Sequence, residues 1–279
     1  MLIAHFFDRV PIGLLLIGTI VIMVVFIEYG FRLGKRAQAQ AKKAQTSQVR
    51  AIMGAGLGLL AFMLAFTFST AQSHFEVRVQ SLAEEARIAR NAFMQADLLA
   101  EPERSQVKQL LKDYVEVRIG INQSSKLVTV EKIAQLIQIS EQIQLDLWSL
   151  AVKGSVQTSE GQVEDGQKGM FMGSVIALTD IHYTRVHSAI MNRIPFTIWM
   201  TLYLMAALSM IIMGYQAGLT DRRSPVATIT LAVAFSAVII LITDLDRPIM
   251  SFFEINKQLL VDLNEYMEAD LSLKYYPGE

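Results

Sequence analysis

The chain contains four long runs of apolar residues, and none of them contains an acidic or basic side chain. They cover residues 10–27, 51–71, 194–213 and 226–243. Each run is long enough for a helix to cross a hydrocarbon core of about 30 Å. The pattern predicts an all-α integral membrane protein with four transmembrane helices.

The second apolar run continues into polar sequence without a change of period. Steps of four and three connect Gly54, Gly58, Ala61, Ala65, Phe68, Gln72, Phe75, Val79, Leu82, Ala86, Ala89, Phe93 and Ala96. No proline or glycine interrupts the chain between Gly58 and Pro102. We therefore expect one helix of about 50 residues, on the order of 75 Å long at about 1.5 Å per residue.

The polar sequence between the second and third runs also has a helical period. Apolar residues recur through 107–121 and 136–150, whereas residues 154–173 are rich in glycine and acids. We expect an extramembrane antiparallel helical bundle, a flexible segment near 154–173, and a last helix that starts near Ser174.

These patterns predict four parts. Residues 1–72 hold the first transmembrane pair and a basic cytoplasmic loop, and residues 73–193 hold the bundle. Residues 194–247 hold the second transmembrane pair, and residues 248–279 form an acidic helical C-terminal tail.

Basic residues set the expected orientation. The segment 28–50 carries Arg32, Lys35, Arg36, Lys42, Lys43 and Arg50 against one acid, and the short loop between the last spans carries Arg222 and Arg223. Both segments lie on the same side of a four-span protein, and basic flanks favour the cytoplasm. The bundle and the C-terminus are then expected outside the cytoplasm.

Composition narrows the class of protein. Of the 279 residues, 52% are hydrophobic and 18% charged, which is too apolar for an ordinary soluble domain. The net charge of −1 gives no reason to expect nucleic acid as a partner, and the absence of cysteine excludes disulfides and thiolate sites. The expected environment is the lipid bilayer.

Catalytic chemistry is not indicated. The four histidines are His5, His74, His182 and His187, and the last two do not share a helix face. No metalloprotease, P-loop, nucleophile-elbow or dinucleotide-binding motif occurs in the sequence. We expect no enzyme activity, no metal site and no cofactor. An ion-coupled transporter is disfavoured because the spans hold no ionisable group.

Small residues form a strip along the second span. Gly54 and Gly58 are continued by Ala61 and Ala65, with Phe62 and Phe66 beside them. One reading is close packing against another helix of the same chain. The other is a pore-lining face with a hydrophobic constriction, with these candidate residues: Gly54, Gly58, Phe62, Ala65, Phe66 and Ser69.

Charged residues gather at the span ends on one membrane face, which includes the sequence "DLDRP" after the fourth span. The cluster comprises Arg78, Arg185, Arg193, Asp244, Asp246 and Arg247. Acids at a helix C-terminus oppose the helix dipole, so Asp244 and Asp246 are expected to seek basic partners. The cluster is interpreted either as a structural clamp between bundle and spans or as a charged vestibule that concentrates ions.

Five stretches together resemble a known family. They are "GLLAFMLAFTFSTAQSHFEVR", "EEARIARNAFMQADLL", "LLKDYVEVRI", "RIPFTIWMTLYLMAALSM" and "DLDRP". This sequence resembles the bacterial bestrophin-like membrane proteins, the domain of unknown function 4239 family. The resemblance implies kinship with bestrophins, which are pentameric anion channels gated by calcium. The dense acidic run of the bestrophin calcium clasp is not found here, and Met250, Ser251 and Phe252 replace the family's frequent glycine after "DLDRP".

Two functions remain from the sequence. One is a homo-oligomeric, channel-like protein in the bacterial inner membrane that passes small ions, as the resemblance and the second span suggest. The alternative is a membrane-anchored sensor or scaffold whose helical bundle binds a ligand or partner.

Overall fold

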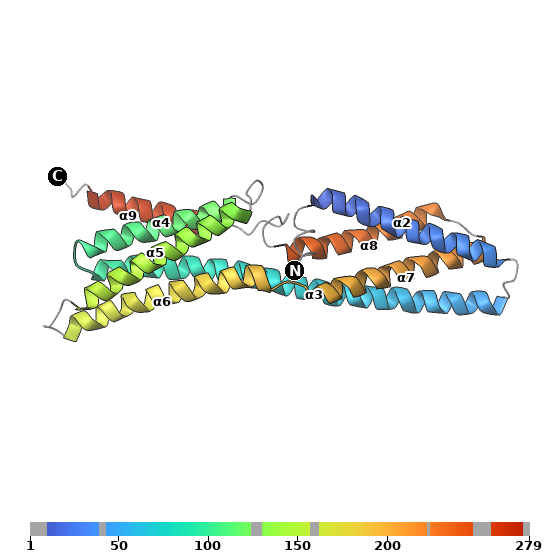
Figure 1. Cartoon of the computed structure of the whole chain (residues 1–279), viewed down its shortest axis with the longest axis horizontal. Helices are drawn as coiled ribbons and strands as arrows, with labels where there is room; N and C mark the ends of the chain where they lie inside the picture. The colour runs from blue at the N-terminus through green and yellow to red at the C-terminus, as the bar shows by residue number, and fades with distance from the viewer. Residues whose placement is uncertain are drawn as a thin grey trace. The chain divides into compact units, whose positions relative to one another are not determined.

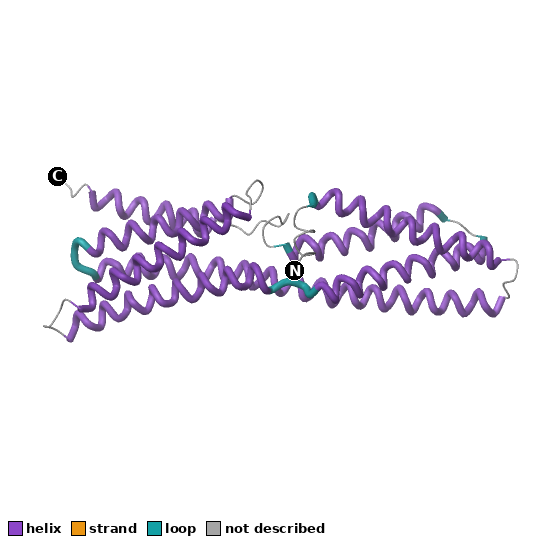
Figure 2. The backbone as a smooth tube through the Cα atoms, in the orientation of Figure 1, coloured by secondary structure: helices purple, strands orange, loops and turns teal. Residues whose placement is uncertain are grey.

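The computed structural model describes residues 10–38, 43–123, 130–156, 162–221, 224–247 and 258–275. Helices account for nearly all of these ranges, and no strand occurs within them, which confirms the all-α class (Figure 2). The predicted features at His5, Lys42, Arg222, Arg223 and residues 248–257 lie outside the described residues.

Two compact units make up the chain. The first comprises Met1–Phe75 and Asn192–Phe253, and the second comprises Glu76–Met191 and Glu254–Glu279. Helix α3 spans Lys43–Gln95 and contributes to both. Its 53 residues confirm the single long helix that the unbroken four-three repeat predicts.

The first unit contains the four helices that are long and apolar enough to cross a membrane. They are α2 (Ile12–Ala37), the first part of α3, α7 (Phe196–Thr220) and α8 (Pro225–Asp246). Helix α2 packs against both α7 and α8 (Figure 1). Leu60 from α3, Leu202 from α7 and Ile239 from α8 are fully buried in the shared core.

Reciprocal glycines hold α2 and α7 at backbone contact. A methyl group on Gly30 or Gly34 would collide with the backbone of Ile211 or Tyr215, and one on Gly214 or Gly218 would collide with the backbone of α2. Two G-x-x-x-G pairs therefore face each other, an arrangement that lets transmembrane helices approach closely.

Gly54 and Gly58 of α3 behave differently. A methyl group on either would meet no atom of the described residues within 4 Å. The reading in which this strip packs against another helix of the same chain is therefore wrong. Leu60 and Leu64 face the interior of the unit instead. Their burial removes more apolar surface from solvent than the burial of a glycine strip would.

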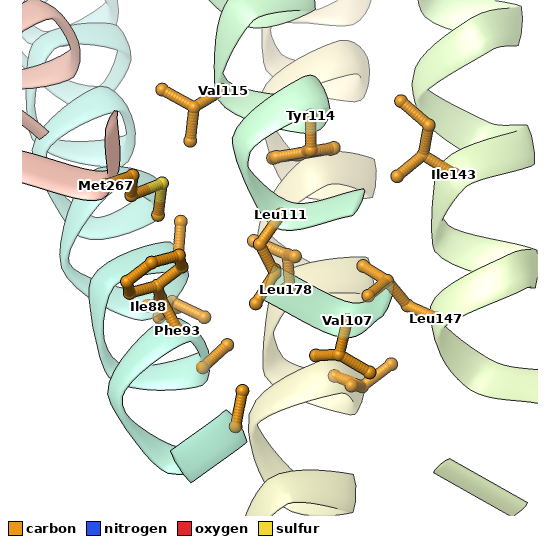
Figure 3. Close-up of a cluster of buried hydrophobic side chains, with 14 of the residues drawn as sticks. Ile88, Phe93, Val107, Leu111, Tyr114, Val115, Ile143, Leu147, Leu178 and Met267 are labelled. Carbon is orange, nitrogen blue, oxygen red and sulfur yellow. The ribbon is translucent and has the colours of Figure 1, made fainter. Parts of the chain in front are cut away.

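The second unit is a helical bundle. It comprises the remainder of α3, the short helix η2 (Ala96–Leu98), α4 (Glu103–Gln123), α5 (Val130–Val156), α6 (Gln162–Met191) and α9 (Gln258–Tyr275). Helix α4 packs against α5 and α9, and α5 packs against α6. Phe93, Leu111, Tyr114, Leu147 and Met267 meet in the core (Figure 3).

Helix α6 begins earlier than the sequence predicts. Its first residue is Gln162, so part of the segment expected to be flexible near 154–173 is helical, and the start near Ser174 is wrong. Phe171 and Val175 are each only 1% exposed in the bundle core. Burial of these side chains outweighs the roughly 1 kcal/mol that each glycine costs in a helix.

Buried Lys108 joins the C-terminal helix to the bundle. Its ammonium lies 2.8 Å from a carboxylate oxygen of Asp97 and 2.7 Å from one of Asp270, which belongs to α9. It also lies 4.5 Å from the ring centre of Phe93. Two carboxylates and a ring face replace the water that the buried ammonium loses, so its burial is compensated.

Candidate functional site

The six pore-lining candidates lie together on one exposed stripe of α3. Phe62 and Phe66 are 65% and 58% exposed in the single chain. Gly54, Gly58, Ala65 and Ser69 are exposed as well. The opposite face of the helix is buried, since Leu60 and Leu64 are 0% and 3% exposed.

This stripe differs in chemistry from the exposed faces of the other membrane helices. Those faces carry large aliphatic side chains, among them Leu14, Ile17, Val21, Val25, Leu204, Leu208, Val226, Ile229 and Val233. Such side chains suit contact with lipid tails. The α3 stripe instead combines glycine, alanine, phenylalanine and serine, and it continues into exposed Gln72 and Ser73.

The predicted charge cluster is divided between the two units. Arg193, Asp244, Asp246 and Arg247 belong to the first unit, whereas Arg78 and Arg185 belong to the second. Pairing of the two acids with these arginines stays a prediction.

Within the first unit, the end of α8 is tied to neighbouring backbone. An Asp246 carboxylate oxygen accepts a hydrogen bond from the Ile194 backbone N–H at 2.9 Å, just before α7 begins. Arg247 donates to the Val10 backbone oxygen at 3.0 Å, just before α2 begins. Both side chains are buried, as is Asp244. Asp246 and Arg247 therefore anchor the end of one candidate span to the entries of two others.

Within the second unit, Arg185 pairs with a residue that the sequence pattern did not predict as its partner. Its guanidinium forms an ion pair and a hydrogen bond with Glu85, whose side chain is fully buried. Arg118 places its Nε 3.0 Å from the same carboxylate, and the Tyr114 hydroxyl donates to it at 2.6 Å. Glu85 thus joins helices α3, α4 and α6.

Burial sets the proton affinities around Glu85. It raises the pKa of the Tyr114 hydroxyl, although the charge of Arg118 acts in the opposite direction. It lowers the pKa of Arg118, and it lowers the pKa of Arg185 to about 10. With its pKa at about 10, Arg185 remains cationic at neutral pH.

His182 lies next to this network. Its ring is edge-on to Tyr114, with centroids 6.4 Å apart, and it is 4% exposed. Neither ring nitrogen has a hydrogen-bond partner in the part of the chain that the structure describes. Burial, helped by the charge of Arg118, lowers the pKa of His182 to about 4. The ring is therefore neutral at physiological pH.

The sequence did carry a signal for these buried charges. Arg118 lies seven residues after Leu111, and Arg185 lies seven residues after Leu178, two leucines that are fully buried. A spacing of seven returns to the same helix face, so both arginines occupy core positions of their helices. A charged residue in such a register predicts a buried ion pair.

No group of three or more His, Asp or Glu side chains that could hold a metal occurs among the described residues.

Comparison with known proteins points to one family. The Bestrophin-like domain matches residues 17–259 of the chain. The fold is similar to the crystal structure of a membrane protein, with a TM-score of 0.63, 13% identity, and coverage of 96% of this chain and 99% of that one. It is also similar to a bacterial bestrophin homolog from Klebsiella pneumoniae carrying a point mutation, with a TM-score of 0.60, 13% identity, and coverage of 96% and 100%. No curated protein matches the chain.

Proposed function

The chain belongs to the Bestrophin-like family, and from this premise we propose that several copies assemble into a channel-like pore for small ions. The proposed location is the bacterial inner membrane. The basic segment between α2 and α3 faces the cytoplasm in this proposal, because flanking Lys and Arg favour that side. The bundle and α9 then lie outside the cytoplasm.

The exposed stripe of α3 carries the proposal. Its phenylalanines and small residues are unpacked in the single chain, unlike the aliphatic faces that suit lipid. Closed rotational symmetry is the usual arrangement of homo-oligomers, and it would bring copies of one helix face around a common axis. The stripe is therefore the face that we place toward the axis.

The residues of the stripe have different roles in the proposed pore. Gly54, Gly58 and Ala65 have little side-chain volume, so they leave width around the axis. Rings of Phe62 and Phe66 would form an apolar constriction, which can control conduction by expelling water. Ser69 offers a hydroxyl beyond the constriction, where exposed polar residues follow.

Ion flux through reconstituted protein tests this function. The purified protein is placed in liposomes, and the flux of monovalent anions and cations is measured for wild type, Phe62→Ala and Phe66→Ala. We expect several-fold higher flux in both variants, because a smaller side chain widens and wets the constriction. Ile17→Ala is the matched control, since Ile17 is 60% exposed on the aliphatic face of α2.

If all three variants conduct ions at the same rate as wild type, Phe62 and Phe66 do not line the pore. A protein that is monomeric in detergent and conducts no ion would instead favour the sensor or scaffold.

A further inference from the structure

A groove of about 690 Å³ opens between α3, α7 and α8 in the first unit. It lies where these helices meet the membrane surface. Arg50 directly precedes the apolar run of α3, Thr220 ends α7, and Ser224 is the N-cap of α8. The volume falls within the range of small-molecule sites, about 300–1,000 Å³.

The mouth of the groove favours negative charge. Arg50 is exposed there, and no acidic residue contributes to the lining among the residues that the structure describes. Ser224 makes no side-chain capping hydrogen bond, and Pro225 occupies the first turn of α8. The next N–H groups therefore have no acceptor inside the helix, and the positive end of the helix dipole points to the same place.

The walls below the mouth are mostly apolar. Met53, Met213 and Leu231 line them from three different helices. Gln216 also contributes to the wall, is 7% exposed, and has a side-chain oxygen without a hydrogen-bond partner among the described residues. A ligand that fits must combine an anionic head with an apolar body.

We propose that this groove binds an anionic phospholipid, with the phosphate at Arg50 and the start of α8 and the upper acyl chain along the methionines. A soluble anion would leave the apolar walls unused. A zwitterionic lipid would bring its own cation beside Arg50. The site is independent of the proposed pore, because it uses a different part of α3 and two helices outside the stripe.

Native mass spectrometry of the purified full-length protein tests the site. Phosphatidylglycerol and phosphatidylcholine with identical acyl chains are added in turn to wild type, Arg50→Gln and Arg36→Gln. Arg36 is the matched control because it is exposed in the last turn of α2 and lies outside the groove lining. We expect wild type to retain phosphatidylglycerol preferentially, and Arg50→Gln to lose about fivefold in its retention, the factor typical of one basic residue at a lipid surface.

A second variant tests the groove without changing charge. Ala227→Trp fills the groove beside α8 and is expected to lower lipid retention as strongly as Arg50→Gln. Equal losses in Arg50→Gln and Arg36→Gln would overturn the proposal in favour of unspecific attraction. Displacement of the lipid by inorganic phosphate would indicate a soluble anion, and a change of oligomeric state without a change of bound lipid would indicate contact with a second copy. These measurements of bound lipid and oligomeric state do not depend on ion flux.

Discussion

Glu85 and His182 show which buried charge the bundle accommodates. Glu85 has cationic partners, whereas a charge on His182 would have no hydrogen-bond partner among the described residues. Glu85 forms ion pairs with Arg118 and Arg185 and accepts a hydrogen bond from the Tyr114 hydroxyl. His182 shares the site but has no hydrogen bond within the described residues. A third cation beside two arginines would be repelled, and burial already disfavours it.

This leads to a pH dependence of stability that belongs to His182. Its pKa is about 4 in the folded protein, below its ordinary value of 6.5. The unfolded chain therefore binds a proton first as the pH falls, so stability is lost between about pH 6.5 and pH 4. The loss is at most about 3 kcal/mol at about 1.36 kcal/mol per pKa unit. Thermal unfolding in detergent should show this loss in wild type and a smaller loss in His182→Gln.

His187 provides the control for this measurement. It lies on the same helix but is exposed. His187→Gln should keep the acid sensitivity of the wild type. If both histidine variants retain it fully, another group is responsible.

The residue level also shows what the sequence could predict. Arg118 and Arg185 occupy core registers, so their burial could be inferred from spacing alone. Their common partner could not, because Glu84 and Glu85 are adjacent and only packing decides that Glu85 is buried while Glu84 pairs with Arg87 at the surface. Pairing of Asp244 and Asp246 with Arg78, Arg185 or Arg193 stays a prediction, because it rests on membrane sidedness and sidedness does not specify contacts.

At the scale of elements, the sequence predicts helix length better than helix partners. The period of α3 is continuous, and the structure has the single helix it predicts. Four G-x-x-x-G pairs occur in the chain, beginning at Gly30, Gly54, Gly169 and Gly214. Only the first and last face each other. Local sequence cannot distinguish them, because the choice depends on which helices become neighbours.

Glycine substitutions separate these two environments. Gly34→Ala places a methyl group against the backbone of Tyr215, so we expect a loss of stability of about 1–3 kcal/mol or more. Gly58→Ala meets no neighbour among the described residues, and we expect unchanged or slightly higher stability because alanine favours helix by about 1 kcal/mol. Thermal stability of the two purified variants is the measurement. Equal destabilisation of both would contradict the one-sided packing.

At the scale of the whole molecule, the chain is a multi-pass membrane protein with a helical bundle between its second and third spans. In the proposed four-span topology, an even number of spans separates the bundle from the C-terminus, so both lie on one side of the membrane. The basic segment before α3 lies on the other side in the same proposal. The assignment of these sides to cytoplasm and exterior is the proposal that requires a direct experiment.

Cysteine labelling can test the orientation because the chain has no native cysteine. Ser47→Cys, at the start of α3, and Ser149→Cys, in α5 of the bundle, both replace exposed serines. A membrane-impermeant maleimide added to spheroplasts should label Ser149→Cys at once and Ser47→Cys only after lysis. The reverse order would invert the orientation.

The glycine contact between α2 and α7 also constrains how the protein is made. About 160 residues separate the end of α2 at Ala37 from the start of α7 at Phe196. Synthesis at about 5–20 residues per second takes roughly 8–30 s to cover that distance. During this interval the first span rests in the bilayer with the backbone of Gly30 and Gly34 uncovered. A newly inserted α2 thus stays in the bilayer without α7. Any delay in translation prolongs the time in which its glycines can contact helices of other proteins.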